Sequence, residues 1–152
     1  MSVILVGSDH AGFELKESLK RHLEASGHVV IDKGPGSTAS VDYPDFAAAV
    51  GRGLAAGEGS LGVLVCGTGI GMSIAANKLP GIRAALVHDP VTARLAREHN
   101  DANVLCLGAR LLAAPYAAAL VDAWLDAAFE ARHQRRLDRV ADLEGGPRRS
   151  RP

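Results

Sequence analysis

Residues 61–78, LGVLVCGTGIGMSIAANK, combine one thiol with a glycine-rich turn. The apolar run ends at Cys66, and Gly67, Gly69 and Gly71 follow at alternate positions before a segment of small residues. Glycine at alternate positions is costly in chain entropy, so another group must approach this backbone closely. Backbone N–H groups that open a helix stabilise anions, both those of a ligand and a thiolate itself. We therefore interpret Cys66 as a general base and the glycine amides as donors to an oxyanion.

Other glycine-loop chemistries require spacings that this stretch lacks. A dinucleotide fingerprint needs G-x-G-x-x-G, whereas residues 67–71 read G-x-G-x-G, and a P-loop needs a lysine directly after its glycines. A hydrolase elbow needs glycines two residues before and after its nucleophile, where Leu64 and Thr68 stand. A cysteine-phosphatase loop of the form C-x5-R needs arginine in place of Met72. Free cysteines are most often small buried hydrophobic residues, and we assign that role to Cys106, which lies inside an apolar run.

Two further segments place polar side chains at predicted strand ends. The first, SDHAG, contains Asp9 and His10. Such a pair can bind hydroxyl groups and an anion, or it can supply a helix cap and a solvated ring. The second, VDYPD, contains Tyr43, which is equally suited to packing and to contact with a ligand. In the same segment, Asp45 is a candidate cap for the helix that follows.

The segment EHNDANVLCLGAR begins at a predicted helix end. His99 is the only histidine of the chain that is followed by an amide and a carboxylate, those of Asn100 and Asp101. The helix dipole alone also favours an imidazole near a helix C-terminus, so the position of His99 does not by itself assign this residue a function.

The segment EARHQRRLDR places arginines on one face of a predicted helix. Arg132 and Arg136 lie four residues apart, and Arg135 and Arg139 form a neighbouring stripe. Most arginine runs are solvated helix faces. Two guanidinium groups on adjacent turns also make a bidentate clamp for a phosphate dianion.

Short β-branched apolar runs alternate with helical patterns along the chain. We expect strands at residues 3–6, 29–31, 61–66, 83–87 and 104–107, and helices at residues 13–26, 45–56, 90–99 and 115–129, followed by a charged segment over residues 130–143. This alternation predicts an α/β fold: a single Rossmann-like three-layer α/β/α domain with a five-stranded parallel sheet and an extended C-terminal helix. Ligands of such sheets bind beyond the carboxyl ends of the strands, where most of the candidate residues fall.

Length and composition limit the remaining possibilities. The chain has 152 residues; we expect residues 1–143 to form one domain and residues 144–152 to form a disordered basic tail. A net charge of +0 gives no global attraction for nucleic acid or an acidic membrane. Two cysteines, no secretory signal pattern and no run near ~18 apolar residues favour a cytoplasmic protein.

Taken together, these residues make the chain resemble the B-type ribose-5-phosphate isomerases, which belong with the sugar-phosphate isomerases that include galactose-6-phosphate isomerase. The likeness runs from SDHAG through DYPD, CGTGIGMSIAANK and EHNDANVLCLGAR to RHQRR, and leaves out the tail after Leu143. The glycine stretch and the HND segment are highly specific for this family. DYPD and the arginine pair carry little weight by themselves.

The resemblance implies an aldose–ketose isomerase that works through an enediolate without a metal or another cofactor. Its substrates would be D-ribose 5-phosphate and D-ribulose 5-phosphate. Cys66 would take the position of the base that moves a proton between C1 and C2, and Thr68 would assist proton transfer to the oxygens. His99 would open the furanose ring, with Asp9 placed to assist. Some relatives lack this cysteine and use a carboxylate elsewhere, so Cys66 places the chain in the thiol-base branch.

The resemblance also implies a substrate-binding set and a shared site. The amides around Gly67, Gly69, Gly71 and Ser73 would hold the oxyanion, Asn100 and Tyr43 would contact the sugar, and His10, Arg132 and Arg136 would bind the phosphate, with Arg110 as an extra contact. The protein would be a homodimer or a dimer of dimers. One subunit would supply the SDHAG and glycine-loop groups, and its partner the HND and arginine groups.

Two rival functions remain open at this level. The first is the same chemistry on another phosphorylated aldose or ketose, a tetrose or a hexose phosphate. The second is a non-catalytic module that binds sugar phosphates. The presence of Cys66, Thr68 and His99 together argues against the second, because binding alone needs no base.

Overall fold

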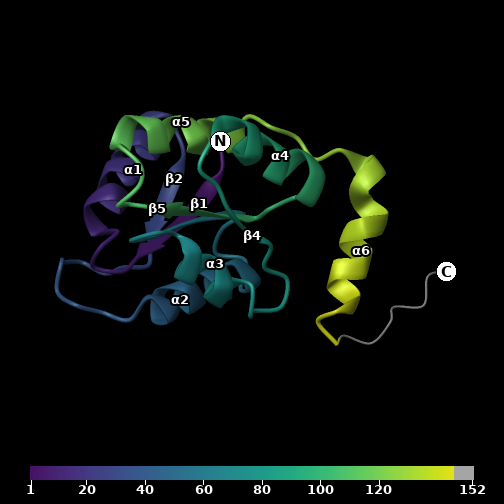
Figure 1. Cartoon of the computed structure of the whole chain (residues 1–152), viewed down its shortest axis with the longest axis horizontal. Coiled ribbons are helices and arrows are strands. Elements are labelled where there is room, and N and C mark those ends of the chain that lie inside the picture. The colour runs from purple at the N-terminus through teal and green to yellow at the C-terminus, as the bar shows by residue number, and fades with distance from the viewer. Residues whose placement is uncertain (146–152) are drawn as a thin grey trace.

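A five-stranded parallel sheet forms the centre of the protein (Figure 1). The computed structural model describes residues 1–145. The strands lie in the order β2-β1-β3-β5-β4, and every neighbouring pair is parallel. Their bounds are Val3–Ser8 for β1, Val29–Asp32 for β2, Leu61–Cys66 for β3, Ala84–Leu86 for β4 and Val104–Gly108 for β5. The predicted α/β architecture is thereby confirmed, whereas most of the predicted tail, from residue 146 on, lies outside the described residues.

Helices cover both faces of the sheet, which gives the three predicted layers (Figure 1). On one face lie α1 (Phe13–Ala25), α4 (Pro90–Asn100) and α5 (Ala114–Leu125), and on the other lie α2 (Tyr43–Ala55) and α3 (Ile70–Ala76). A short 3₁₀ turn, η1 (Ala131–His133), leads into α6 (Gln134–Asp142). No residue of α6 is buried, and Figure 1 shows this helix standing apart at the end of the molecule away from α1.

Local sequence signals explain most element boundaries. All six residues of β3 are buried, because this central strand is covered by helices on both faces. In α1 the buried leucines follow helical spacing, and Gly27 just beyond the helix adopts a left-handed conformation with φ of 84°. Asp89 caps α4: its Oδ1 accepts a hydrogen bond from the Thr92 N–H at 2.8 Å, and Pro90 occupies the first turn.

Two predicted helix boundaries were wrong. The helix expected over residues 115–129 ends at Leu125, and the chain then crosses to η1 in a non-helical stretch. At the end of that stretch the Glu130 N–H donates to the Glu98 carbonyl oxygen of α4 at 2.8 Å. This long-range contact holds the chain beyond the helix against α4. The helix expected from Asp45 begins instead at Tyr43, with Asp42 as its N-cap.

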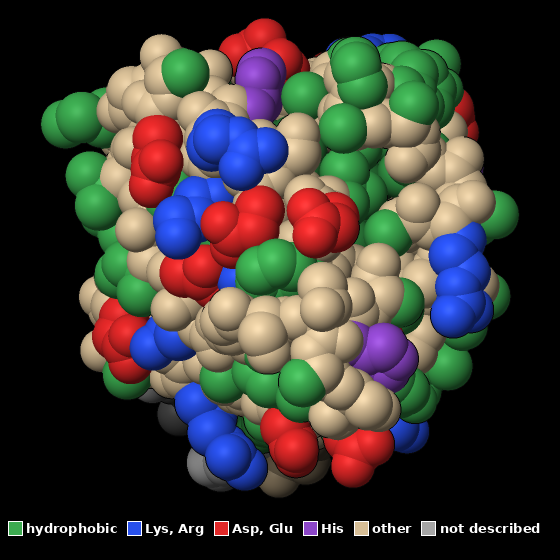
Figure 2. Space-filling view, turned by 90° about the vertical axis from the view of Figure 1, so that its left-hand side faces the viewer, with side chains coloured by type: hydrophobic (Ala, Val, Ile, Leu, Met, Phe, Trp, Pro, Cys, Tyr) green, Lys and Arg blue, Asp and Glu red, His purple; other side chains and the backbone are tan. Residues whose placement is uncertain are grey.

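The surface near α1 carries balanced charge. Figure 2 shows basic and acidic side chains close together on this side of the molecule. Lys20 of α1 pairs with Asp32 of β2 at 3.2 Å, and Lys33 pairs with Glu58. Within residues 1–145, no helix combines the length and the apolar character that crossing a bilayer requires.

Candidate active site

The Cys66 thiol lies at the carboxyl end of β3 and is held by the glycine turn. Only 4% of the residue is exposed, and its Sγ accepts a hydrogen bond from the Gly69 N–H at 3.1 Å. A backbone donor aimed at sulfur stabilises negative charge on it. Cys106 differs: it is fully buried, burial raises the pKa of its thiol, and the nearby Cys66 raises that pKa further. Only the first cysteine is therefore placed for acid–base chemistry.

The turn after Cys66 requires glycine at its centre. Gly69 has φ of 77°, and a Cβ there would lie 2.5 Å from Leu86 Cδ1. Thr68 Oγ1 accepts from the Ile70 N–H at 3.2 Å, which leaves the hydroxyl proton free to be donated. Within residues 1–145, the N–H groups of Gly71 and Met72 in the first turn of α3 have no acceptor. They are the donors that remain for a ligand oxygen.

Two large side chains cover the flanking glycines. A Cβ on Gly67 would lie 3.1 Å from the Arg110 guanidinium carbon, and a Cβ on Gly71 would lie 2.7 Å from the Tyr43 ring. The Arg110 N–H also donates to the Gly67 carbonyl oxygen at 2.9 Å. Glycine is therefore needed at Gly71, where the tyrosine ring rests on the backbone, whereas at Gly67 the flexible Arg110 side chain could give way.

Asp9 and His10 lie beside the thiol at the carboxyl end of β1. The Asp9 N–H donates to the Val65 carbonyl oxygen at 3.1 Å, which ties this segment to β3. Asp9 is 8% exposed, and its Oδ1 accepts from the Gly12 N–H at 2.9 Å. His10 Nδ1 lies 3.2 Å from both the N–H and the carbonyl oxygen of Val41, so it anchors the loop that leads to α2.

These residues form one group, which we call the thiol half-site. It consists of Asp9, His10, Tyr43, Cys66, the glycine turn 67–71, Ser73 and Arg110. The Ser73 N–H and Oγ are engaged within the turn, by the Gly69 and Ile70 carbonyl oxygens. The structure thus brings together every predicted residue of the SDHAG, DYPD and glycine-loop segments.

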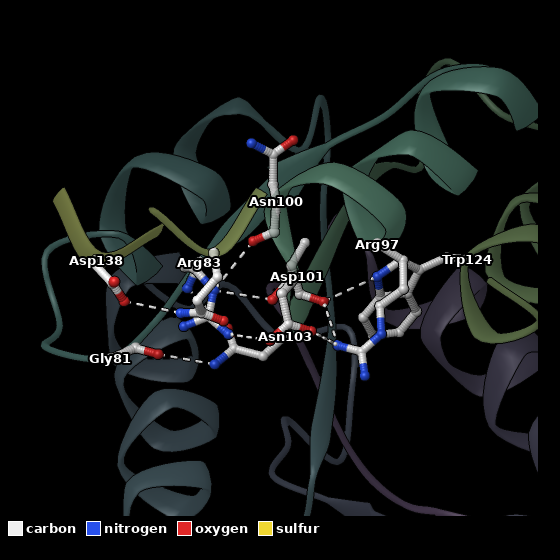
Figure 3. A network of polar contacts seen from close by, with 10 residues as sticks. Gly81, Arg83, Arg97, Asn100, Asp101, Asn103, Trp124 and Asp138 are labelled. Atoms are coloured by element: carbon white, nitrogen blue, oxygen red, sulfur yellow. Dashed lines mark hydrogen bonds and ion pairs between the residues drawn. The ribbon is translucent and has the colours of Figure 1, made fainter. Parts of the chain in front are cut away.

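The HND segment is held by a polar network at the other end of α4 (Figure 3). Asp101 has a left-handed backbone with φ of 44°, and its carboxylate pairs with Arg83 at 3.1 Å and with Arg97 at 2.7 Å. Arg83 Nε also donates to the Asn100 carbonyl oxygen at 3.2 Å. Figure 3 shows the Asn100 amide group turned away from this network. Asp101 is therefore structural, and Asn100 presents its amide elsewhere.

His133 packs against His99 and joins it to the arginines. The ring centroids of the two histidines are 4.3 Å apart. Arg136 Nη1 donates to His133 Nδ1 at 2.9 Å, and Glu130 forms an ion pair with Arg132 at 2.5 Å. His133 is only 6% exposed; burial lowers its pKa, and the positive charge of Arg132 lowers it further. This imidazole therefore stays neutral at neutral pH.

The four arginines Arg132, Arg135, Arg136 and Arg139 line a cavity of about 350 Å³ between them. We call His99, Asn100, Glu130, His133 and these four arginines the basic half-site. Guanidinium groups that converge in this way bind phosphate through charge-assisted hydrogen bonds.

Comparisons with known proteins identify the family of this chain. A family model described as Ribose/Galactose Isomerase matches residues 4–140. The chain belongs to the ribose/galactose isomerase family. It is 47% identical over 145 residues to the ribose-5-phosphate isomerase B of Escherichia coli strain K12, covering 95% of this chain and 97% of that protein.

Solved structures of family members have the same fold. The ribose-5-phosphate isomerase B of Clostridium thermocellum superposes with a TM-score of 0.92 at 46% identity, covering 94% of this chain and 97% of that one. The enzyme of Mycoplasma genitalium, solved with bound ribulose-5-phosphate, gives a TM-score of 0.89 at 42% identity, with 95% of this chain and 97% of that one covered.

In this member of the isomerase family the two half-sites lie at opposite edges of the sheet. Cys66 ends β3, whereas His99 lies in the last turn of α4, just before the chain enters β5 at Val104. Since β3 and β5 are parallel, His99 sits at the amino edge. Six residues of strand separate the two edges by roughly 17 Å. One chain alone does not bring the predicted residues into a single site.

The basic half-site of this isomerase is poorly suited to a metal ion. His99, Glu130 and His133 bring potential ligand atoms within 4.8 Å of one another. Because Arg136 can only donate, His133 Nδ1 is an acceptor and the neutral ring carries its proton on Nε2. Nε2 then has no lone pair for a metal. Glu130 is engaged by Arg132, so the donor set suits an anion instead.

Sequence reasoning missed His133, Glu130 and Met72. His133 was hidden inside the arginine run, and nothing in its neighbours along the chain indicates that its ring meets His99, 34 residues earlier. Helical spacing does place His133 next to Arg136, three residues on. That spacing is the one feature of the sequence that could have indicated the contact between His133 and Arg136.

Proposed function

We propose that this protein interconverts D-ribose 5-phosphate and D-ribulose 5-phosphate through an enediolate, with Cys66 as the base. The observation that carries the proposal is the sulfur held 3.1 Å from the Gly69 N–H at a strand end of this isomerase fold. The ribulose-5-phosphate bound to the Mycoplasma genitalium relative supports the choice of substrate.

The thiol half-site performs the proton transfers. The Cys66 thiolate removes the proton from C2 of the open-chain aldose, and the electron pair moves through C1 onto the carbonyl oxygen. The Gly71 and Met72 N–H groups stabilise the resulting oxyanion, a contribution of roughly 2.7–4 kcal/mol per donor in comparable sites. The thiol then returns its proton to C1, while Thr68 relays a proton from the oxygen on C2 to the oxygen on C1. Atoms and charge balance without a cofactor.

The basic half-site binds and opens the substrate. Arg132 and Arg136 hold the phosphate dianion, which places the sugar for reaction at its other end. His99 assists ring opening by moving a proton between the anomeric hydroxyl and the ring oxygen, and Asn100 contacts the sugar hydroxyls. His10, Tyr43, Arg110 and Asp9 complete the set from the thiol half-site.

We further propose that the functional unit is a homodimer in which each site combines the thiol half-site of one chain with the basic half-site of the other. The separation of the half-sites supports this, because a single chain leaves them at opposite sheet edges. An apolar groove of about 610 Å³ also lies between α6 and the body, lined by Leu137 and Val140 on one side and Leu79 and Ile82 on the other. Val140 is 46% exposed in the single chain, and a second copy would bury it. The free thiols of such an enzyme suit the reducing cytoplasm.

A substrate panel tests the reaction. In a coupled assay we expect kcat/KM for ribose 5-phosphate to exceed that for a tetrose or a hexose phosphate by at least about tenfold. A higher value for either of the other sugars would reassign the substrate. Binding of all three without turnover of any would favour the non-catalytic module.

Subunit mixing tests the shared site. Cys66→Ala and Arg136→Ala chains are each expected to be inactive at low substrate concentration. After equilibration of the two, half of the dimers are mixed, and each mixed dimer contains one intact site. The mixture should therefore recover about one quarter of the wild-type activity. No recovery would show that each site belongs to a single chain.

A further inference from the structure

The outer arginines of the basic half-site carry charge that a monophosphate does not need. Arg132 is paired with Glu130, and Arg136 is hydrogen-bonded to His133. Among the described residues, Arg135 and Arg139 have no hydrogen-bond or ion-pair partner, yet they line the same cavity as the inner pair. Within residues 1–145, the lining of that cavity includes no acidic residue.

This arrangement differs from the other charged surfaces of the molecule. Near α1, basic side chains lie beside acidic ones (Figure 2). One such pair is that of Lys20 and Asp32. Four guanidinium groups that face one cavity repel one another unless an anion lies between them. Two guanidinium groups already balance the charge of a single phosphate dianion, so the outer pair fits a ligand with more than one phosphoryl group.

We propose that the four-arginine cavity binds a condensed phosphate chain, and that such a ligand inhibits the enzyme by competing with its substrate. The inference rests on the proposed phosphate role of Arg132 and Arg136. Arg132, in η1, and Arg135, in the first turn of α6, lie four residues before Arg136 and Arg139, respectively. Successive phosphoryl groups that run along the helix would each meet one inner and one outer arginine. Because both ligands need Arg132 and Arg136, the condensed phosphate and the sugar phosphate cannot bind at the same time.

Competitive inhibition measures this selectivity. Inhibition constants of orthophosphate, inorganic diphosphate and citrate are determined against ribose 5-phosphate in metal-free buffer at constant ionic strength. We expect diphosphate to bind at least about tenfold more tightly than orthophosphate, and citrate, a trianion without phosphoryl groups, to bind no better than orthophosphate. The double variant Arg135→Gln/Arg139→Gln should reduce the diphosphate preference to about twofold.

Matched controls separate site binding from general charge. The double variant Arg21→Gln/Arg52→Gln removes two exposed arginines from α1 and α2 and should keep the wild-type preference. Equal inhibition by diphosphate and orthophosphate, or an unchanged preference in Arg135→Gln/Arg139→Gln, would overturn the inference while leaving the proposed function intact. Dissociation of the dimer in Arg135→Gln/Arg139→Gln would also overturn the inference, because the outer arginines would then serve the subunit interface.

A different set of results would contradict the proposed function itself. If orthophosphate does not compete and Arg136→Ala keeps its KM, the inner phosphate site is contradicted and the inference fails with it. ADP distinguishes the two sources of such a ligand: inhibition equal to that of diphosphate shows that the phosphate chain alone is recognised. Markedly stronger inhibition by ADP, lost in Arg135→Gln/Arg139→Gln, identifies a nucleotide as the ligand.

Discussion

The two half-sites are built by different means. In the thiol half-site the backbone does most of the positioning: Cys66 is buried, its sulfur is held by the Gly69 N–H, and Asp9 is tied to the neighbouring strand through Val65. In the basic half-site, contacts between side chains do the positioning. Arg136 is aligned by His133 and stands on α6, a helix with no buried residue.

This difference matches the two tasks that we assign to the half-sites. Proton transfer depends on donor positions held to within fractions of an ångström, which buried strands and a packed turn provide. Phosphate binding tolerates long side chains, because charge attracts over a distance and guanidinium groups can adjust. Four predictions test this contrast, starting with the largest expected effect.

Loss of the thiol should stop the reaction. In Cys66→Ser we expect kcat to fall by at least about 10³-fold, because a hydroxyl is a far weaker base than a thiolate, while phosphate ligands still bind. Cys106→Ala is the matched control: this buried thiol should be replaceable with kcat unchanged within about twofold and a loss of roughly 1–2 kcal/mol in the free energy of unfolding. A near-normal rate in Cys66→Ser would contradict the assignment of the base.

Loss of an inner arginine should weaken binding more than chemistry. For Arg136→Ala we expect KM to rise about 10- to 100-fold with kcat much less affected, which is the pattern of a lost charge-assisted hydrogen bond to the phosphate. Steady-state kinetics on ribose 5-phosphate measure both constants, and Arg21→Ala on α1 serves as the control. A fall of similar size in kcat with KM unchanged would show that Arg136 takes part in the chemistry and not only in phosphate binding.

The contact between His133 and Arg136 should have a smaller effect on binding. His133→Leu removes the acceptor that aligns Arg136, so KM should rise about 3- to 10-fold through lost pre-organisation. His133→Asn keeps an acceptor oxygen near the place of Nδ1 and should retain a KM closer to that of the wild type. Identical KM values for the two variants would show that the alignment is incidental.

Acid should weaken the ion pair between Lys16 and Asp32, which joins α1 to β2. Burial alone raises the pKa of Asp32, but hydrogen bonds from Lys16 and from the Gly34 N–H outweigh it and lower that pKa. A lowered folded-state pKa means that the stabilisation is complete above the unfolded pKa of about 3.9 and is lost as the pH falls below about 4. Thermal melts should therefore show a shallower loss of Tm below pH ~4 in Asp32→Asn than in the wild type.

The control for this measurement is Asp45→Asn, which changes an exposed carboxylate at the start of α2. It should follow the wild-type curve. Asp32→Asn also leaves the buried Lys16 ammonium without its main partner, so it should be less stable than the wild type already at pH 7. Parallel curves for wild type and Asp32→Asn would show that this ion pair contributes nothing to acid stability.

Local patterns in the sequence predicted most of the fold. The alternation of apolar strands and helices, the buried run Leu61–Cys66 and the Asp89 cap are all decided by neighbours along the chain. The end of α5 was mispredicted; beyond it the chain is held by the Glu130 N–H donating to the Glu98 carbonyl oxygen, a contact between distant parts of the sequence. Likewise the left-handed Asp101 is supported by Arg83 from another strand end, which no local pattern shows.

By itself the sequence determined which groups can react: a thiol before a glycine turn, a histidine at a helix end and arginines one turn apart. Those features follow from residue type and short spacing, which set local conformation and local chemistry. Only the tertiary structure decided where the groups lie relative to one another. Because parallel strands send Cys66 and His99 to opposite edges of one sheet, the chain divides its reactive groups between two half-sites, and no spacing along the sequence encodes that separation.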